Sequence, residues 1–201
     1  NWPEAVKSVP RVGGGLDPHI ESIVALKPDL VLAAGSTRGV ERLEALGLKV
    51  LRLEPRTHAD VQRVLRTVAL ALFVPEAESE RVWRDMQAGV QAAGQSLSQK
   101  ARSQKVYFEV SPSPHGASAS SFIGETLSRM GVSNILPAAL GPFPQINPEF
   151  VVLAQPDVVM AGDSSRASMV QRPGWASMRA IQANRLCVFK PSEADMLVRA
   201  G

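Results

Sequence analysis

Three histidines are the side chains of this chain best suited to bind a transition metal. His19, His58 and His115 stand far apart in the sequence, and none has the spacing of a zinc motif. His19 and His58 fall in the first turns of predicted helices, and we expect His58 to be solvated. No carboxylate is marked out as their partner, so we expect no bound metal. A metal site that uses His19 or His115 is kept as an alternative.

Sequence motifs for covalent or phosphoryl chemistry are absent. The chain has neither a Gly-x-Ser-x-Gly nucleophile elbow nor a phosphate loop of the Gly-x4-Gly-Lys-Ser/Thr type. Gly13-Gly14-Gly15 precedes a helix, but it follows no clear strand and lacks the dinucleotide-binding spacing, which favours a flexible turn. We therefore expect neither an enzyme nor a cofactor.

Two glutamates open the two copies of a repeated segment. Glu21–Ala33 recurs as Glu149–Ala161, at a constant offset of 128 residues (21 to 149, and 29 to 157). In each copy an amphipathic helix ends at a Pro-Asp pair, and an apolar, β-branched strand follows. Two copies of one helix-turn-strand unit predict two similar lobes with a cleft between them.

The role of Glu21 and Glu149 has two interpretations. A carboxylate in the first turn of a helix is stabilised by the helix dipole by about 0.3–1 kcal/mol, which needs no function. Alternatively, equivalent positions on two lobes present two exposed carboxylates that could dock into basic pockets of a two-fold partner. The helix caps are out of register, because Pro18 lies three residues before its glutamate and Pro148 only one. The residues alone leave both interpretations open.

Two loops offer candidate ligand contacts. The polar loop from Ser111 to Ser120 includes His115 and could supply hydrogen-bonding groups. Phe143 lies between two prolines, where a large apolar residue has no periodic reason to be buried, and exposed loop aromatics commonly contact ligands. Trp175 follows a Pro-Gly pair, and we expect it to pack at a helix start rather than face the cleft.

Helix and strand alternate along the first part of the chain, which is typical of a parallel α/β layer. Asp17-Pro18 supplies a cap and a first-turn proline for the first helix, and Asn147-Pro148 does the same later. Thr57 and Asp60 have the pattern of a capping box. Strands are expected at 30–34, 50–53, 106–110, 157–161 and around 186–189, with helices ending near 26, 47 and 131, a loop around 163–165 and a short helix after 174.

One long helix is predicted from Pro75 to about Gln104, because apolar residues recur at three- and four-residue spacing with acidic residues early and basic residues late. Two shorter helices broken near Gly94 are the alternative. The predicted organisation is an incomplete N-terminal lobe at 1–74, a connecting helix at 75–104, and a C-terminal lobe at 105–201 without its final helix.

Composition excludes several classes of protein. The net charge is +3, Lys and Arg are scattered, and only 5% of residues are aromatic, so we expect no nucleic-acid partner. No apolar run approaches the roughly 20 residues that span a bilayer. The single cysteine, Cys187, lies in an apolar strand and is expected to be a buried, inert thiol. The chain begins at Asn1 without a methionine or signal peptide, so we expect a piece of a longer protein.

Taken together, these features resemble the class III substrate-binding proteins of ABC importers, which serve cobalamin, siderophores, haem and metal ions. The likeness rests on the helix that runs into Ala-Leu-Lys-Pro-Asp-Leu-Val-Leu, the long central helix and the second copy of the signature. Within that class the chain is most similar to the cobalamin-binding proteins. The segments that carry this likeness are Ile20–Val31, Ser121–Leu127, Gly141–Glu149 and Arg172–Trp175.

The resemblance implies an α/β fold of two Rossmann-like lobes joined by a long rigid helix, here trimmed at both ends. It also implies a monomeric periplasmic receptor that binds cobalamin between its lobes and delivers it to a membrane permease and its ATPase. Glu21 and Glu149 match the lobe glutamates that pair with permease arginines, and Phe143 matches an aromatic that flanks the corrinoid. Gly15 and Ala34 stand where the cobalamin subgroup can carry cleft tryptophans.

Other functions stay open at this stage. A haem receptor or an iron-siderophore receptor of the same class is the first alternative, and an anionic siderophore would need convergent cations such as Arg38 or Arg166. A metal-ion receptor that uses His19 or His115 is a second alternative. An enzyme subunit built on the same two-lobed fold, as in some nitrogenase-like proteins, is disfavoured because the chain has no cysteine cluster ligands.

Overall fold

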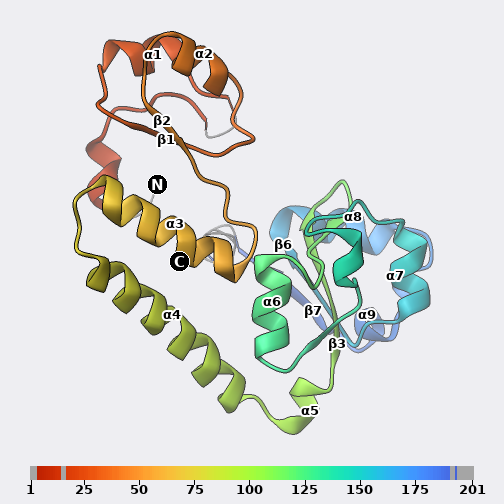
Figure 1. Ribbon diagram of the computed structural model, residues 1–201. Helices are drawn as coiled ribbons and strands as arrows, with labels where there is room; N and C mark the ends of the chain where they lie inside the picture. Colours follow the sequence, from red (N-terminus) through yellow and green to blue (C-terminus); the bar gives the residue numbers. More distant parts are fainter. Residues whose placement is uncertain (1–3, 15–16, 191–192, 194–201) are drawn as a thin grey trace. The chain divides into compact units, whose positions relative to one another are not determined.

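The computed structural model describes residues 4–14, 17–190 and 193, which form two compact units (Figure 1). The N-terminal unit comprises residues 1–54 and the C-terminal unit residues 55–201. Both contain helices and parallel strands, as expected for an α/β protein. The division into lobes at 1–74 and 105–201 stays a prediction; the helices between them belong to the C-terminal unit.

The N-terminal unit is a small parallel α/β layer. Its strands β1 (Val31–Ala33) and β2 (Val50–Arg52) pair in parallel, with Leu32 opposite Leu51. Ile23, Val40 and Leu43 are its buried apolar side chains among the described residues. The helical elements are η1 (Glu4–Ser8), α1 (Ile20–Ala25) and α2 (Val40–Ala45).

Two details of the N-terminal unit differ from prediction or add to it. The helix α1 begins at Ile20 rather than at the predicted Asp17-Pro18, because Pro18 forms an antiparallel bridge with Gly13 and is held outside the helix.

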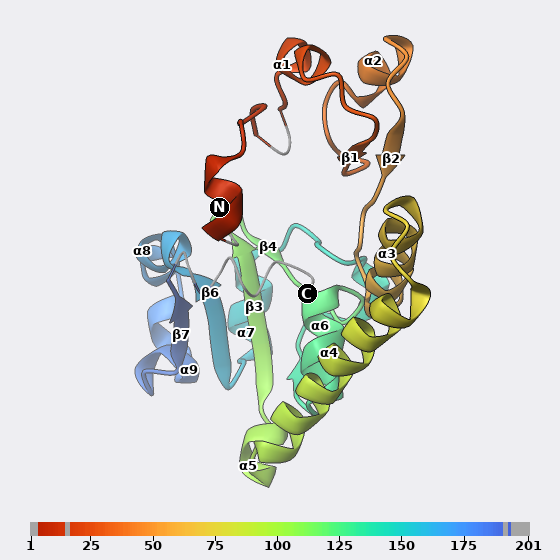
Figure 2. The ribbon, with the colours of Figure 1, turned by 90° about the vertical axis from the view of Figure 1, so that its left-hand side faces the viewer.

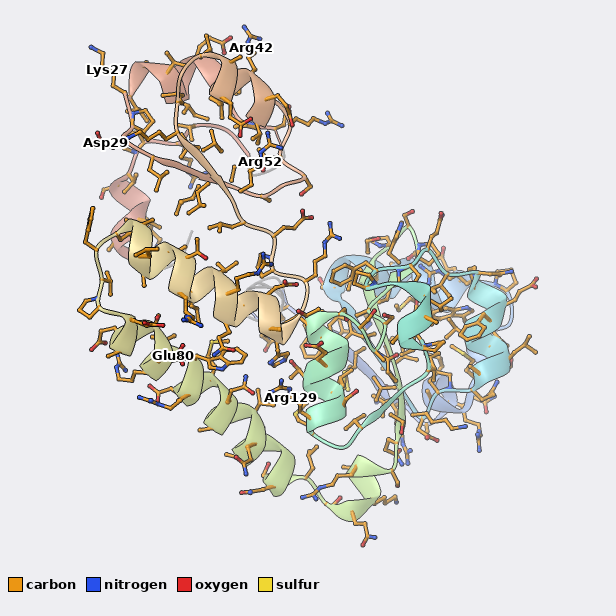
Figure 3. All side chains as sticks on the ribbon, in the orientation of Figure 1. Lys27, Asp29, Arg42, Arg52, Glu80 and Arg129 are labelled. Atoms are coloured by element: carbon orange, nitrogen blue, oxygen red, sulfur yellow. The ribbon has the colours of Figure 1, made fainter. Side chains whose placement is uncertain are left out.

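Arg52, at the end of β2, reaches two carboxylates of α2 (Figure 3). Its guanidinium lies 2.6 Å from the Glu44 carboxylate and 3.2 Å from that of Glu41. This pairing ties strand to helix at an exposed edge.

The C-terminal unit begins with an antiparallel helix pair, α3 (His58–Ala71) and α4 (Glu76–Ser96). The predicted capping box at the start of α3 is confirmed. The Thr57 hydroxyl accepts a hydrogen bond from the Asp60 backbone N–H, and the Asp60 carboxylate accepts one from that of Thr57. The chain turns between the helices at Phe73, which has a positive φ of 56°.

The predicted continuous helix from Pro75 to Gln104 is wrong. The helix α4 ends at Ser96, and a short helix, α5 (Gln99–Arg102), follows. Leu97 and Ser98 have extended backbones with ψ of 135° and 155°. The Ser98 hydroxyl accepts a hydrogen bond from the Ala101 N–H, so Ser98 caps a new helix instead of continuing the old one. The break, at Leu97 and Ser98, lies three to four residues beyond Gly94, so the alternative of two shorter helices is confirmed.

The sheet of the C-terminal unit has the order β4-β3-β6-β7, with β5 paired to the first half of β3 (Figure 2). Strands β5, β6 and β7 run parallel to their partners, and only β4 is antiparallel. The strands are β3 (Lys105–Ser111), β4 (His115–Gly116), β5 (Ser133–Asn134), β6 (Val158–Gly162) and β7 (Leu186–Phe189). The helices are α6 (Phe122–Arg129), η2 (Ala138–Leu140), α7 (Pro148–Ala154), α8 (Asp163–Gln171), η3 (Trp175–Ser177) and α9 (Arg179–Gln182).

The segment after β6 is a helix rather than the predicted loop around 163–165. Asp163 stands in the first turn of α8, where a carboxylate is favoured by the helix dipole. Met169, on the same helix, is fully buried. The polar run Asp163-Ser164-Ser165 therefore begins a helix, and Met169 of that helix belongs to the main core.

One face of this sheet carries the main core, which includes Tyr107, Val159 and Trp175. Trp175 is fully buried, so the expectation that it packs at a helix start is confirmed. Cys187, by contrast, is exposed, and the prediction of a buried thiol is wrong. It pairs with Met160, which neighbours Val159 and therefore points to the opposite face, and it lies on the edge strand β7.

The repeated segments have matching backbones. Lys27 and Gln155, which occupy the same position in the two copies, both have a positive φ, of 47° and 45°. Each follows its helix and precedes a Pro-Asp pair and a parallel strand. Figure 3 shows Lys27 and Asp29 at this turn in the N-terminal unit. Left-handed residues other than glycine are uncommon, so their recurrence supports a repeat at the level of backbone conformation.

Candidate functional site

The repeated glutamates occupy equivalent helix positions. Glu21 is the second residue of α1, and Glu149 is the second residue of α7. The mismatch of the two proline caps disappears, because α1 starts at Ile20 and α7 at Pro148. The Glu21 side chain is 82% exposed, with only a 3.9 Å approach to Arg42, and Glu149 is also exposed. Both carboxylates are therefore available to a partner.

The loop after β3 brings Ser111 and His115 together. The two residues pair across a hairpin between β3 and β4. The Ser111 hydroxyl donates to the Ser113 carbonyl at 2.8 Å, and His115 Nδ1 lies 2.5 Å from the same oxygen. Because a carbonyl only accepts, Nδ1 carries the proton in the neutral ring, and Nε2 keeps its lone pair. Both side chains are half-buried.

Phe143 lies beside this hairpin. Gln145 forms an isolated antiparallel β-bridge with His115. On either side of Phe143, the Pro144 carbonyl accepts from the Gly116 N–H at 3.1 Å and the Pro142 carbonyl accepts from the Ser118 N–H at 3.0 Å. The Phe143 side chain is 44% exposed, as expected for a loop aromatic that does not pack in the core. Ser111, His115 and Phe143 thus lie on adjoining segments where β3 ends, the usual edge for ligands in α/β sheets.

A buried ion pair supports the same loop, and the sequence reasoning missed it. Glu109 is fully buried in β3, and Arg172 donates to both of its carboxylate oxygens, at 2.6 and 3.0 Å. The Tyr107 hydroxyl donates to Glu109 at 3.1 Å; burial, with the adjacent Glu109 charge, holds the pKa of Tyr107 far above its usual value. A carboxylate inside an apolar strand was the available signal, since a buried charge requires a partner.

His58 is buried at the junction of three helices, so the prediction of a solvated side chain is wrong. Its ring stacks on Phe122 of α6 with centroids 4.5 Å apart, and Nε2 lies 2.8 Å from the Thr126 hydroxyl. Gln87 of α4 contacts Nδ1 at 3.3 Å and also accepts a hydrogen bond from Arg129. Figure 3 shows Arg129 on α6, on the side of α4. Burial lowers the pKa of His58, Arg129 lowers it further, and Glu125 opposes the shift.

The N-terminal candidates are less informative. Gly15 lies outside the described residues. Ala34 follows β1 and lines a cavity of about 480 Å³, together with apolar residues of the same unit such as Ile23, Leu30 and Leu43. His19 is exposed at the N-cap of α1, and its side chain caps nothing. Within the described ranges no three His, Cys, Asp or Glu side chains cluster as metal ligands.

None of the helices in the described part of the chain combines the length and apolar character needed to cross a bilayer.

The chain belongs to the periplasmic binding protein family, whose model matches residues 1–193. Curated relatives include an uncharacterised ABC transporter substrate-binding lipoprotein, YvrC, of Bacillus subtilis, which is 26% identical over all of this chain and 65% of its own length. The vitamin B12-binding protein of Pectobacterium carotovorum is 28% identical over 82% of this chain and 61% of its own length. The chain therefore spans less than two thirds of these relatives.

The fold is also found among solved structures. Staphylococcus aureus IsdE, crystallised with haem, superposes with a TM-score of 0.78 at 16% sequence identity, covering 98% of this chain and 83% of that one. This likeness establishes the fold and agrees with the α/β architecture of a class III binding protein.

Proposed function

We propose that the chain is part of the solute receptor of an ABC importer. The receptor binds a corrinoid, cobalamin, and delivers it to a permease and its ATPase from the periplasmic side of the membrane. The proposed role is binding rather than catalysis. The observation that carries the proposal is the exposed Phe143 ring beside the Ser111–His115 hairpin, which joins an apolar platform to polar groups at the ligand edge of the sheet.

Several facts support cobalamin as the ligand. A corrinoid has a large, mostly apolar macrocycle with amide side chains, which suits an aromatic face flanked by hydroxyl and imidazole groups. The family match covers nearly the whole chain, and one of the curated relatives is named for vitamin B12 binding. The predicted placement of the ligand between two lobes, with Gly15 and Ala34 on the other side, stays part of the proposal.

Haem is the second candidate, and the geometry of His115 favours it. The Ser113 carbonyl fixes the proton on Nδ1, so Nε2 is left as a potential ligand for iron. A carbonyl-oriented imidazole is the usual arrangement of a metal-binding histidine. Haem and cobalamin share a large macrocycle of four linked nitrogen-containing rings around a central metal, so the same hairpin and Phe143 could serve either.

Calorimetric titration of the purified chain with cobalamin, and separately with haem, tests the proposal. We expect one-to-one binding of cobalamin, weakened about tenfold or more in Phe143→Ala, since an aromatic contact of this kind contributes about 1–3 kcal/mol. Phe150→Ala is the matched control, because Phe150 is similarly exposed, at 40%, but lies on α7. Its affinity should equal that of the unmodified chain.

The two ligand arms distinguish the candidates. Tight haem binding with a Soret shift that is lost in His115→Ala, without cobalamin binding, would replace cobalamin by haem. Equal affinities of Phe143→Ala and Phe150→Ala would remove Phe143 from the site. Binding of neither ligand by the chain, or by a longer form of the protein, would overturn the tetrapyrrole assignment.

A further inference from the structure

Arg172 makes contacts with two different parts of the C-terminal unit. Its Nη1 and Nη2 atoms each donate to one carboxylate oxygen of Glu109. Nη2 also donates to the Pro112 carbonyl at 3.0 Å. The guanidinium carbon also lies 4.7 Å from the centre of the Trp175 ring. The side chain is only 11% exposed. Arg172 therefore joins the interior of β3 to the loop that follows it.

The ion pair is built as a rigid anchor. Glu109 has no exposed surface, and its carboxylate accepts hydrogen bonds from Arg172 and Tyr107. The Tyr107 ring packs edge-on against Trp175, at 6.0 Å, so the anchor lies within the main core. A bidentate arginine–carboxylate pair fixes both distance and orientation, which a lysine cannot do.

The loop 111–115 connects Arg172 to the candidate ligand contacts. Pro112, whose carbonyl Arg172 holds, lies directly between Ser111 and Ser113. The Ser113 carbonyl in turn accepts from the Ser111 hydroxyl and from His115 Nδ1. Holding the Pro112 carbonyl thus restrains the next residue, Ser113, on whose carbonyl the orientation of both side chains depends.

We propose that Arg172 is a positioning residue for ligand binding: it holds the Ser111–His115 hairpin in its binding geometry from the buried Glu109, without contacting the ligand. The expected effect of Arg172 on ligand affinity rests on the proposed function. The claim that Arg172 holds the hairpin in place does not, and it can be tested in the ligand-free protein.

The first experiment compares Arg172→Lys with the unmodified chain in the absence of ligand, by NMR. Lysine keeps a cation near Glu109 but cannot hold the carboxylate and the Pro112 carbonyl together. We expect faster hydrogen exchange of the Gly116 amide, which donates to the Pro144 carbonyl. We also expect the ¹⁵N shifts of the His115 ring to move from those of the Nδ1–H tautomer toward those of a mixture of tautomers. Arg166→Lys, an exposed substitution on α8, is the control. A folded Arg172→Lys variant with unchanged Gly116 exchange and His115 shifts would overturn the proposal.

The second experiment is a double-mutant cycle in affinity for cobalamin and for haem. Arg172→Lys should weaken binding about tenfold, as loss of an outer supporting contact commonly does. In a His115→Ala background the same substitution should cost much less, because the side chain that it positions is gone. Additive losses would show that Arg172 acts independently of the hairpin. If the unmodified chain binds neither ligand, the proposed function fails, while the ligand-free comparison still decides the role of Arg172.

A further variant covers the case in which Arg172→Lys does not fold. The pair Glu109→Gln with Arg172→Met removes both charges, so no uncompensated ion is left in the core. This variant also lacks the donor to Pro112. It should therefore fold and show the same loosening of the hairpin, and a native-like hairpin in it would overturn the proposal equally.

Discussion

His58 shows how a single residue couples folding to protonation. The ring is 1% exposed, stacked on Phe122 and hydrogen-bonded to Thr126. Burial and the nearby Arg129 charge lower its pKa, although Glu125 opposes them. The folded state therefore disfavours the protonated imidazole, and we expect its protonation to weaken the junction between α3 and α6.

The stability of the C-terminal unit is therefore expected to depend on pH. The unfolded chain binds a proton at His58 near its ordinary pKa of about 6.5, and the folded chain only at lower pH. Stability is complete above about pH 6.5 and falls as the pH decreases toward the folded-state pKa. Urea unfolding followed from pH 8 to pH 5 measures this slope.

A His58→Gln variant isolates the contribution of this residue. It should be less stable at pH 8 by about 1–3 kcal/mol, because buried hydrogen bonds are lost or imperfect. Its stability should vary less between pH 8 and pH 5 than that of the unmodified chain. His19→Gln, at an exposed position, is the control and should keep the original slope. Identical slopes in His58→Gln and the unmodified chain would contradict the coupling.

At the scale of elements, the features encoded locally were predictable. The Thr57–Asp60 capping box and the Asn147-Pro148 helix start are as the sequence predicts, because their hydrogen bonds join residues two or three positions apart. The burial of His58 was not predictable, since its partner Thr126 is 68 residues away. The Glu109–Arg172 pair spans 63 residues and escaped for the same reason. The end of α4 was mispredicted although its cause is local. The apolar spacing continues past Ser96, but Ser98 caps a new helix there, and the sequence pattern did not show that the cap would prevail.

The capping box has a measurable contribution at this scale. Thr57→Ala removes the side-chain acceptor for the Asp60 N–H and should lower the free energy of unfolding by about 0.5–2 kcal/mol. Thr67→Ala, within the same helix, is the matched control. It should change the free energy of unfolding by no more than about 0.5 kcal/mol, because Thr67 caps no helix and alanine is well tolerated inside one. Chemical denaturation of both variants provides the comparison. Equal effects would show that the cap contributes nothing specific.

At the scale of the whole molecule, each compact unit contains one copy of the repeated segment. Glu21 belongs to the N-terminal unit and Glu149 to the C-terminal unit, each at the second position of its helix. Both are exposed, and neither is needed to close a core. We propose that the two carboxylates pair with basic groups on the two halves of the permease, the contact that the resemblance implies.

Transport measurements separate docking from ligand binding. In an importer assembled with the full-length protein, Glu21→Ala and Glu149→Ala should each reduce cobalamin uptake about tenfold, equivalent to about 1.4 kcal/mol of lost docking energy. Ligand affinity should stay unchanged. Glu78→Ala is the control, because Glu78 also stands in the first turn of a helix and so reproduces the loss of a dipole interaction. Equal reduction by all three variants would leave only the helix-dipole interpretation.

The exposed Cys187 on the edge strand β7 has a practical consequence for all of these measurements. It is the only cysteine in the sequence, so a maleimide dye would label every molecule at one defined sulfur and give a fluorescence reporter without mutagenesis. The same thiol can also join two copies through a disulfide during storage in air. Samples kept without reductant would then contain a covalent dimer that could be mistaken for a native oligomer.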